Sequence, residues 1–379
     1  MAKVRAASVY EEIGVKRVVN AAGHMTILGG SIVSPRVQAA MDEANVHFVG
    51  MEELLEKSGV AIAEMLGSEA ALVTSGAAAA LVQGSSALMA GKDPAKITRL
   101  PDTTGMKNEF LIQKVTRYHY DRMVTVPGAR LIEVGTNKGT TARELEAAIG
   151  PRTAGILYFA HMEGEEGVLS IPQVVEIAHK RGIAVLVDAA GEVYPLDRMR
   201  WIPSVSGADL VCFGAKYVGA PHSTGILCGV RELVEAATLS GFIAYEIKDN
   251  RAVGRAMKVD RQEVVAVVVA LREWLNMNHE TRLLKGAARV DVIVRGLTGV
   301  PHVVTEREKV HRGPGVHVKV IVDEAGLGKK AADVAKALAD GDPAIWVWCE
   351  GNILHIGVSN LLEGEDKLVA DRLREEFAR

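Results

Sequence analysis

The sequence predicts an α/β fold with a mostly parallel sheet, followed by a smaller α+β domain. Three observations predict this fold class. Short apolar runs alternate with helical apolar spacing from about residue 68 onwards. Two of these runs, 184–188 and 209–216, end in one ionisable residue among small residues. Near Gly254 the alternation gives way to one long helical pattern and a second set of strands. Such alternation is typical of right-handed βαβ units whose parallel strands are covered by helices on both faces.

Three segments are expected along the chain. They are an N-terminal arm with helices over 1–60, a large α/β domain over 61–254 and a small α+β domain over 255–379. The arm has helical spacing over Pro35–Phe48 and Glu52–Leu66. In the large domain the expected strands are Ala71–Thr74, Phe110–Gln113, Arg130–Val134, Gly155–Ala160, Ile183–Val187, Leu210–Phe213 and Gly225–Cys228. The helices expected between them are Ala77–Met89, Ala142–Ile149 and Pro172–Arg181, the last of which is stopped by Gly182. In the small domain we expect one long helix over Arg261–Leu283, strands over Val316–Val322, Ala344–Cys349 and Ile353–Val358, and a closing helix over Glu365–Phe377.

Composition excludes several classes of function. The 379 residues include 44 basic and 47 acidic side chains, so the net charge of −3 gives no bulk attraction to nucleic acid or to anionic membranes. The three cysteines, Cys212, Cys228 and Cys349, lie in or at the ends of expected strands, which favours core positions over a disulfide or metal set. The chain opens on no leader pattern, and no apolar run reaches about 18 residues. We therefore expect a soluble cytoplasmic protein without a metal, nucleic-acid or membrane partner.

Asp188 and Lys216 carry most of the functional information. Each follows an apolar strand, and an open parallel sheet places its chemistry just beyond the carboxyl ends of its strands. A lysine that forms a Schiff base and a carboxylate that keeps a pyridine nitrogen protonated are the pair that pyridoxal phosphate requires. Taken singly, Asp188 could cap a βα turn and Lys216 could lie at the surface. Together, and with the turn described next, they predict a pyridoxal phosphate site.

A polar turn at Ser75, Gly76 and Ala77 separates an apolar strand from an alanine-rich helix. The turn places backbone N–H groups and hydroxyls at a helix N-terminus, which favours a phosphate. The alternative is an ordinary serine N-cap. Beyond another strand end, His161 and Glu163 are candidates for acid and base groups, against the alternative of a solvated acidic loop.

The order of these motifs resembles that of fold type I pyridoxal phosphate enzymes with an aspartate aminotransferase-like architecture. More narrowly it resembles the bacterial selenocysteine synthase-like family, which includes L-seryl-tRNA(Sec) selenium transferase and D-glucosaminate-6-phosphate ammonia-lyase-type proteins. The resemblance rests on Thr74-Ser-Gly-Ala77, Val187-Asp-Ala-Ala190 and the Gly-x-Lys-x-x-x-x-Pro-x-x-Thr-Gly pattern over 214–225. Supporting segments are Val18-Val-Asn-Ala-Ala-Gly23, Leu28-Gly-Gly30, Leu100-Pro-Asp-Thr103 and Gly254-Arg-x-Met-Lys-Val259.

The resemblance implies a role for each matching residue. Lys216 would form the Schiff base, Asp188 would pair with the pyridinium nitrogen, and the turn at Ser75, Gly76 and Ala77 would hold the phosphate. Ser223 and Thr224 would reach the cofactor of a partner subunit, which implies a homodimer or a higher homo-oligomer. The candidates for substrate or ring contacts are Arg117, His119, His161, Glu163, His222 and Arg255.

The chain departs from the family pattern at two places where anion-binding groups are common. Phe213 and Gly219 replace a serine and an arginine around Lys216, and the small domain reads Gly357-Val-Ser-Asn360 where an arginine often lies. The sequence thus predicts a lyase that removes the α-proton of a small hydroxy amino acid and eliminates its β-hydroxyl, giving a 2-oxo acid and ammonia. The alternatives are a racemase, an aldolase, a scaffold that binds the cofactor without catalysis and, disfavoured by the charge, a tRNA-dependent selenium transferase.

Overall fold

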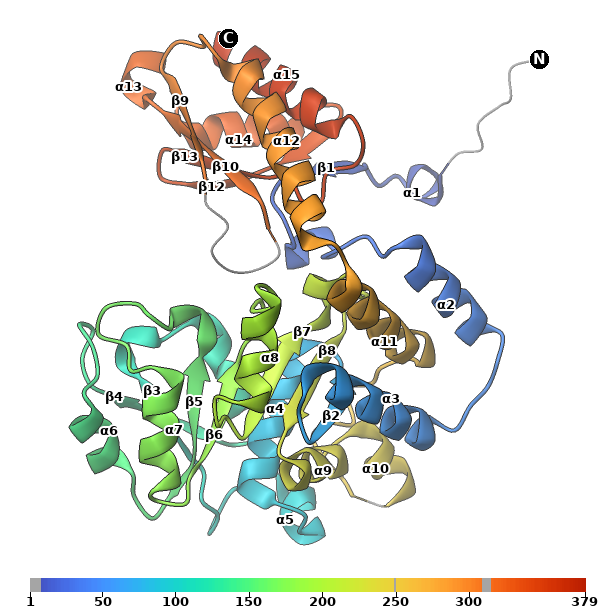
Figure 1. Ribbon diagram of the computed structural model, residues 1–379, viewed down its shortest axis with the longest axis vertical. Helices are drawn as coiled ribbons and strands as arrows, with labels where there is room; N and C mark the ends of the chain where they lie inside the picture. The colour runs from blue at the N-terminus through green and yellow to red at the C-terminus, as the bar shows by residue number, and fades with distance from the viewer. Residues whose placement is uncertain (1–7, 249, 309–314) are drawn as a thin grey trace. The chain divides into compact units, whose positions relative to one another are not determined.

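The computed structural model describes residues 8–248, 250–308 and 315–379, which form two compact units (Figure 1). The large unit comprises residues 31–276, and the small unit comprises the chain up to residue 30 together with residues 277–379. This division differs from the three segments expected from the sequence. The first 60 residues are shared between the two units, and the helix that follows residue 260 belongs to the large one.

The large unit is built around one sheet of seven strands in the order β2-β8-β7-β6-β5-β3-β4. Its strands are β2 (Ala70–Thr74), β3 (Glu109–Gln113), β4 (Arg130–Val134), β5 (Thr153–Phe159), β6 (Ala184–Asp188), β7 (Leu210–Gly214) and β8 (Gly225–Gly229). Neighbouring strands from β7 to β4 are parallel, whereas β8 is antiparallel to both β7 and β2. All residues of β5, β7 and β8 are buried, as expected for strands covered on both faces.

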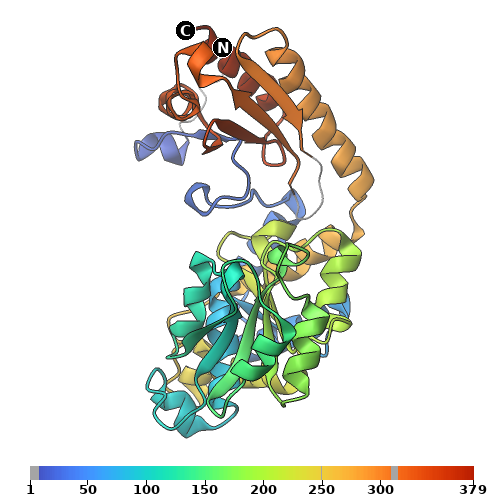
Figure 2. The same cartoon turned by 90° about the vertical axis from the view of Figure 1, so that its left-hand side faces the viewer.

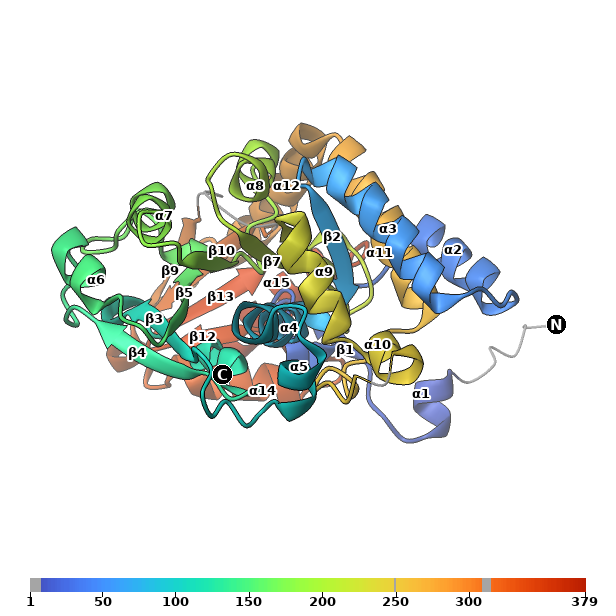
Figure 3. The ribbon, with the colours of Figure 1, turned by 90° about the horizontal axis from the view of Figure 1, so that it is seen from below.

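Helices cover both faces of this sheet. Figure 3 shows α4 on one side, and α7 and α8 on the other. The α4 helix is rich in alanine and glycine and is buried nearly all round, so it packs directly on the strands; a Cβ at Gly84 would lie 3.2 Å from Leu186 of β6. The helices of the large unit are α2 (Pro35–Asn45), α3 (Met51–Leu66), α4 (Gly76–Ala90), α5 (Pro94–Arg99), α6 (Ala142–Ala148), α7 (Ile171–His179), α8 (Leu196–Ser204), α9 (Arg231–Leu239), α10 (Phe242–Ile247) and α11 (Arg261–Asn276). Short 3₁₀ turns follow several strands, namely η2 (Lys114–Thr116), η3 (His119–Thr125), η4 (Ala160–Met162) and η5 (Ala215–Val218).

The single helix expected over Arg261–Leu283 is two helices in the structure. The first of these, α11, ends at Asn276. The second, α12 (His279–Leu297), starts after Asn278, whose side-chain oxygen accepts the Thr281 N–H as an N-cap. The α11 helix stays with the large unit because it packs on α2 and α3 and because the Trp274 indole donates to the Val193 carbonyl over 2.9 Å.

The small unit has a four-stranded antiparallel sheet in the order β12-β13-β10-β9 (Figure 2). Two helices, α12 and α14, contact this sheet, and α15 packs on both of these helices. A second, two-stranded parallel sheet joins β1 to β11. The expected strand over Ala344–Cys349 is therefore split between the two sheets. The elements of the small unit are α1 (Val9–Glu12), β1 (Val18–Asn20), η1 (Thr26–Leu28), α12, β9 (Val303–Arg307), β10 (His317–Val322), α13 (Glu324–Leu327), α14 (Ala331–Asp340), β11 (Ala344–Trp346), β12 (Trp348–Glu350), β13 (Ile353–Gly357) and α15 (Glu365–Ala378). Among the helices in the described ranges, none combines the length and apolar character that a membrane span requires.

Candidate active site

Strand direction brings the predicted residues to one edge of the large sheet. The carboxyl ends of β2, β5, β6 and β7 meet there, which places Ser75, His161, Asp188 and Lys216 along it. Because β8 runs the opposite way, its amino end reaches the same edge and brings Thr224 with it. The single reversed strand thus joins the turn before β8 to the other candidates.

Asp188 is the last residue of β6 and is only 8% exposed. One carboxylate oxygen accepts the Ala190 N–H over 3.0 Å and lies 3.7 Å from the Cys212 sulfur on β7. Burial raises the pKa of this carboxyl to about 6, and the two hydrogen bonds offset only part of that rise. A cation placed against Asp188 would therefore stabilise its ionised form strongly.

Lys216 lies in η5, directly after β7, and its carbonyl accepts the Ser31 hydroxyl over 2.6 Å. Burial lowers the pKa of its amine. The Lys216 Nζ lies 5.1 Å from the ring centroid of Tyr217. Burial raises the pKa of the Tyr217 phenol to about 12, with smaller effects from Tyr118, Tyr120 and Asp188. Tyr217 therefore interacts with both predicted residues, so Asp188 and Lys216 lie close together beyond the carboxyl ends of β6 and β7, a region called the crevice below.

The Ser75 turn leads from β2 into the N-terminus of α4. Ser75 is the N-cap residue of α4 but its side chain makes no capping hydrogen bond, and Gly76 has a φ of +84°, which favours glycine. The start of β8 lies directly on this turn, because a Cβ at Gly225 would be 2.6 Å from the Ala77 nitrogen. Only glycine fits at that position, so the N-terminus of α4 and the turn before β8 stay in contact.

The turn before β8 is held by one hydrogen bond within the turn and by one to α11. The Thr224 hydroxyl donates to the Pro221 carbonyl over 2.7 Å, and the Ser223 hydroxyl donates to Glu263 of α11. The Nδ1 atom of His222 is buried and has no hydrogen-bond partner in the described part of the chain. Burial and the nearby Lys216 lower the pKa of His222, which places this imidazole beside the crevice.

Aromatic and histidine rings contact one another beyond the carboxyl ends of the neighbouring strands β3 and β5. Tyr118 lies edge-on to His161 with a centroid distance of 5.1 Å and to Phe159 with 5.8 Å, and it contacts His119 at 4.3 Å. The pKa of Tyr118 is raised by burial first, and then by Tyr120 and Asp188. The structure therefore brings His119 and His161 to the same crevice as Asp188.

Three charged candidates are instead bound in ion pairs. Arg117 pairs with Asp121 and Glu133. Arg255 pairs with Glu246 over 2.7 Å and lies 5.6 Å from the ring of Tyr245.

Glu163 is held just as firmly. It pairs with Arg198 over 2.8 Å, and its other oxygen accepts the Ile171 N–H over 2.9 Å. The Arg198 guanidinium also binds Glu192 and the Ala160 carbonyl, which ties the loop after β5 to the loop after β6. A carboxylate with both oxygens engaged in this way fits a structural role better than acid or base work.

Sequence reasoning missed Tyr118 and Tyr217. Both lie next to predicted residues in the chain, so the signal was an aromatic residue adjacent to a strand-end candidate. No set of three or more histidine, cysteine or acidic side chains within the described ranges is arranged to hold a metal ion.

Residues 18–331 match the family model described as L-seryl-tRNA selenium transferase. The chain belongs to this family. The D-glucosaminate-6-phosphate ammonia lyase of Salmonella typhimurium is 32% identical over 97% of both chains. A solved structure of D-glucosaminate-6-phosphate ammonia-lyase superposes with a TM-score of 0.85 at 28% identity over 99% of both chains. The 5'-C-glycyluridine monooxygenase-decarboxylase of a Streptomyces species is 33% identical over 89% of this chain and 83% of its own.

A serine palmitoyltransferase from S. paucimobilis, solved with a bound pyridoxal phosphate–myriocin aldimine, shares the fold. It superposes with a TM-score of 0.59 at 15% identity, over 95% of this chain and 87% of its own. The predicted family and the predicted fold type I architecture are both confirmed. Family and fold together imply pyridoxal phosphate as the cofactor.

Proposed function

We propose that this family member is a pyridoxal phosphate-dependent ammonia-lyase acting on a small 2-amino-3-hydroxy acid. The observation that carries the proposal is the convergence of Asp188 and Lys216 on Tyr217 at the carboxyl edge of the sheet. The ammonia lyase of Salmonella, similar over nearly the whole chain, supports this reaction class.

The crevice fits the cofactor at three points. Asp188 is a buried carboxylate whose ionised form needs a positive partner, and a protonated ring nitrogen would supply one. Ser75, Gly76 and Ala77 offer the uncapped start of α4 to a phosphate. Lys216 carries an amine whose pKa is lowered by burial, so more of it is neutral and nucleophilic near neutral pH. Bound there, pyridoxal phosphate supplies an aldehyde that captures an amino group and a ring that accepts the electron pair of the α-carbon.

The chain's own residues then handle the protons. Lys216 Nζ takes the proton from the α-carbon, while Asp188 stays ionised and holds the ring nitrogen protonated. The β-hydroxyl leaves with a second proton as water, and His119, His161 and His222 are the candidates that donate it. Hydrolysis of the released enamine gives one 2-oxo acid and one ammonia.

The assembly proposed for this reaction is a homodimer in the cytoplasm, without a nucleic-acid, membrane or metal partner. Ser223 and Thr224 belong to the turn that lies on Gly76, so a second subunit that packs at this turn would border the phosphate. The near balance of charges, 44 basic against 47 acidic residues, supports the absence of tRNA.

The test is to supply D- and L-forms of 2-amino-3-hydroxy acids to the loaded protein and to measure ammonia and 2-oxo acid. Equal amounts of both products are expected from one stereochemical series. Lys216→Ala should abolish the release, whereas the control Lys138→Ala, at an exposed loop position, should not change it. Absence of both products with every substrate would refute the proposal.

Other products would name the competing reactions. An epimer indicates a racemase, and glycine with an aldehyde indicates an aldolase. Oxygen uptake with carbon dioxide release would indicate the chemistry named for the Streptomyces relative, which is as similar to this chain as the lyase is.

A further inference from the structure

A short ring-bearing segment follows β3 and lines the crevice. Tyr118, His119 and Tyr120 are consecutive, and Tyr118 is their link to the rest of the site. Its ring packs edge-on against Phe159 at the end of β5, with an interplanar angle of 84°. Phe159 is in turn the register partner of Asp188 across β5 and β6, and the nearby Asp188 charge contributes to the raised pKa of the Tyr118 phenol. The position of the Tyr118 ring therefore defines one wall of the proposed cofactor and substrate site.

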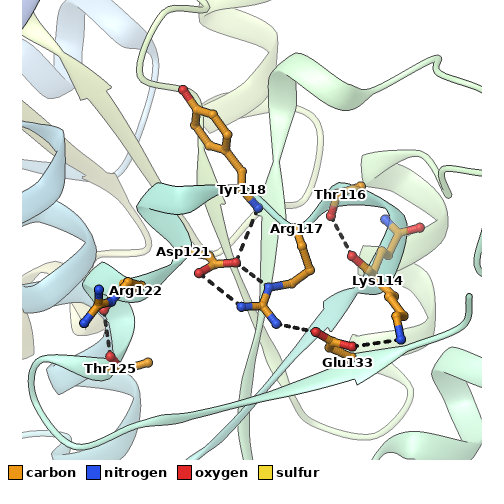
Figure 4. A network of polar contacts seen from close by, with 9 residues as sticks. Lys114, Thr116, Arg117, Tyr118, Asp121, Arg122, Thr125 and Glu133 are labelled. Carbon is orange, nitrogen blue, oxygen red and sulfur yellow. Dashed lines mark hydrogen bonds and ion pairs between the residues drawn. The ribbon is translucent and has the colours of Figure 1, made fainter. Parts of the chain in front are cut away.

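The backbone of this segment is fixed by Asp121. The Asp121 side chain is 3% exposed and accepts the Tyr118 N–H over 3.4 Å. It also accepts from Nε and Nη2 of Arg117. Figure 4 shows that this network lies on the backbone side of Tyr118, while the Tyr118 ring points away from it.

Arg117 extends the network to the neighbouring strand. Its guanidinium also donates to Glu133 of β4, and Lys114 binds the second oxygen of Glu133 over 3.3 Å (Figure 4). Two carboxylates therefore share the Arg117 guanidinium. A guanidinium engaged in this way anchors the segment to β4 and has little capacity left for a substrate carboxylate.

We infer that Asp121 is a positioning residue for the active site, which acts by holding the Tyr118 ring against the crevice through the Tyr118 N–H and the Arg117 guanidinium. The inference rests on the proposed function only in that the crevice is where the chemistry takes place. Arg117 therefore belongs to the residues that hold the site in place and not to the substrate candidates.

The first test measures the ionisation of Tyr118 and needs no turnover. In each protein, wild-type or variant, the Tyr118 titration is obtained as a difference. The ultraviolet pH titration of that protein with Tyr118→Phe added is subtracted from the titration of the same protein with Tyr118. Tyr118 is already 38% exposed, and Asp121→Ala should expose the remaining face of its ring by freeing it from Phe159, so the pKa of Tyr118 should fall toward the ordinary value of about 10. Asp121 is not among the groups that shift this pKa, so its charge alone would not produce the fall.

Two control variants make the result specific. Arg122→Gln removes a charge from the same 3₁₀ segment, but the Arg122 side chain is exposed and only its carbonyl takes part in the contacts of Figure 4. It should leave the Tyr118 titration unchanged. Glu133→Gln removes the outer carboxylate charge but keeps Asp121, so its effect should be smaller than that of Asp121→Ala.

The second test uses the loaded enzyme and its best substrate. Asp121→Ala should lower kcat at least tenfold while KM changes less than threefold, because the wall is displaced and the substrate-binding groups stay. Asp121→Asn keeps an oxygen that can accept the Tyr118 N–H and should recover part of the loss; it also replaces the alanine variant if that variant fails to fold.

An unchanged Tyr118 titration in a folded Asp121 variant would overturn the inference. So would an equal loss of kcat in Arg122→Gln. If the wild-type protein releases no ammonia, the proposed function fails, but the Tyr118 titration still decides the role of Asp121.

Discussion

Asp188 should destabilise the cofactor-free protein at neutral pH, and replacing it with asparagine should reveal this. Its carboxyl has a pKa of about 6 in the folded protein, against an ordinary value of 3.8, because burial disfavours the ionised form. Between these two values the folded state binds more protons than the unfolded state. The free energy of unfolding must therefore decrease as the pH rises through this window.

The magnitude follows from the size of the shift. A rise of about two pKa units costs about 3 kcal/mol once the carboxyl is ionised in both states. Asp188→Asn removes that cost. At pH 8 the cofactor-free variant should be more stable than the wild-type protein by up to about 3 kcal/mol, which is a rise in Tm of about 6 to 12 °C for a unit of this size. Near pH 4 the two proteins should melt together.

The assay is thermal unfolding of both cofactor-free proteins from pH 4 to pH 8, followed by circular dichroism. Adding pyridoxal phosphate should reverse the order at pH 8, because a ring cation would then stabilise the Asp188 carboxylate and only the wild-type protein has that carboxylate. A difference in Tm that is the same at pH 4 and pH 8 would show that Asp188 acts through packing rather than through its charge. No difference at either pH would refute the burial argument.

Three further outcomes are expected. After borohydride reduction the wild-type protein should gain the mass of reduced pyridoxal phosphate on Lys216, while Lys216→Ala should bind the cofactor without a covalent adduct; an equal adduct in that variant would place the Schiff base elsewhere. Arg198→Met should lower the free energy of unfolding by about 3 to 5 kcal/mol, because the buried Glu192 and the partly buried Glu163 would be left without a cation; urea titration measures this, and a change below about 1 kcal/mol would contradict it. Dilution to monomer should release the cofactor if a second subunit packs at the turn of Ser223 and Thr224 and borders the phosphate there, because assembly and binding are then linked; a fully loaded monomer in analytical ultracentrifugation would refute this.

Much of the fold could be predicted because buried parallel strands are simple patterns. Each expected strand of the large domain overlaps an observed one, from β2 to β8. Periodicity carried no information on direction, so the reversal of β8 could not be read from it. The break at Met277 was equally hidden, since the apolar spacing continues across it while Asn278 starts a new helix. Helix breaks of this kind are decided by a cap and by which unit each half packs on.

The candidate site could be predicted only in part. The positions of Asp188, Lys216 and the Ser75 turn could be predicted because they follow from strand ends, whereas their roles stay a prediction. Arg117 and Glu163 were singled out for their charge, but the sequence does not show that their charges are already bound by Asp121 and Arg198. Whether an ionisable side chain is available to a ligand depends on its neighbours in space, which a motif does not list.

The pairing of β1 with β11 has a consequence for how the chain acquires its structure. Val18–Asn20 form a parallel pair with Ala344–Trp346, so β1 pairs with a strand that lies more than 300 residues further along the chain. Residues 31–276 are thus an insertion within the small unit. During synthesis the small unit cannot be completed before β11 and the elements after it are made, whereas all residues of the large unit have been made by then. A fragment that begins at residue 31 would keep the large sheet whole and leave β11 with an open edge.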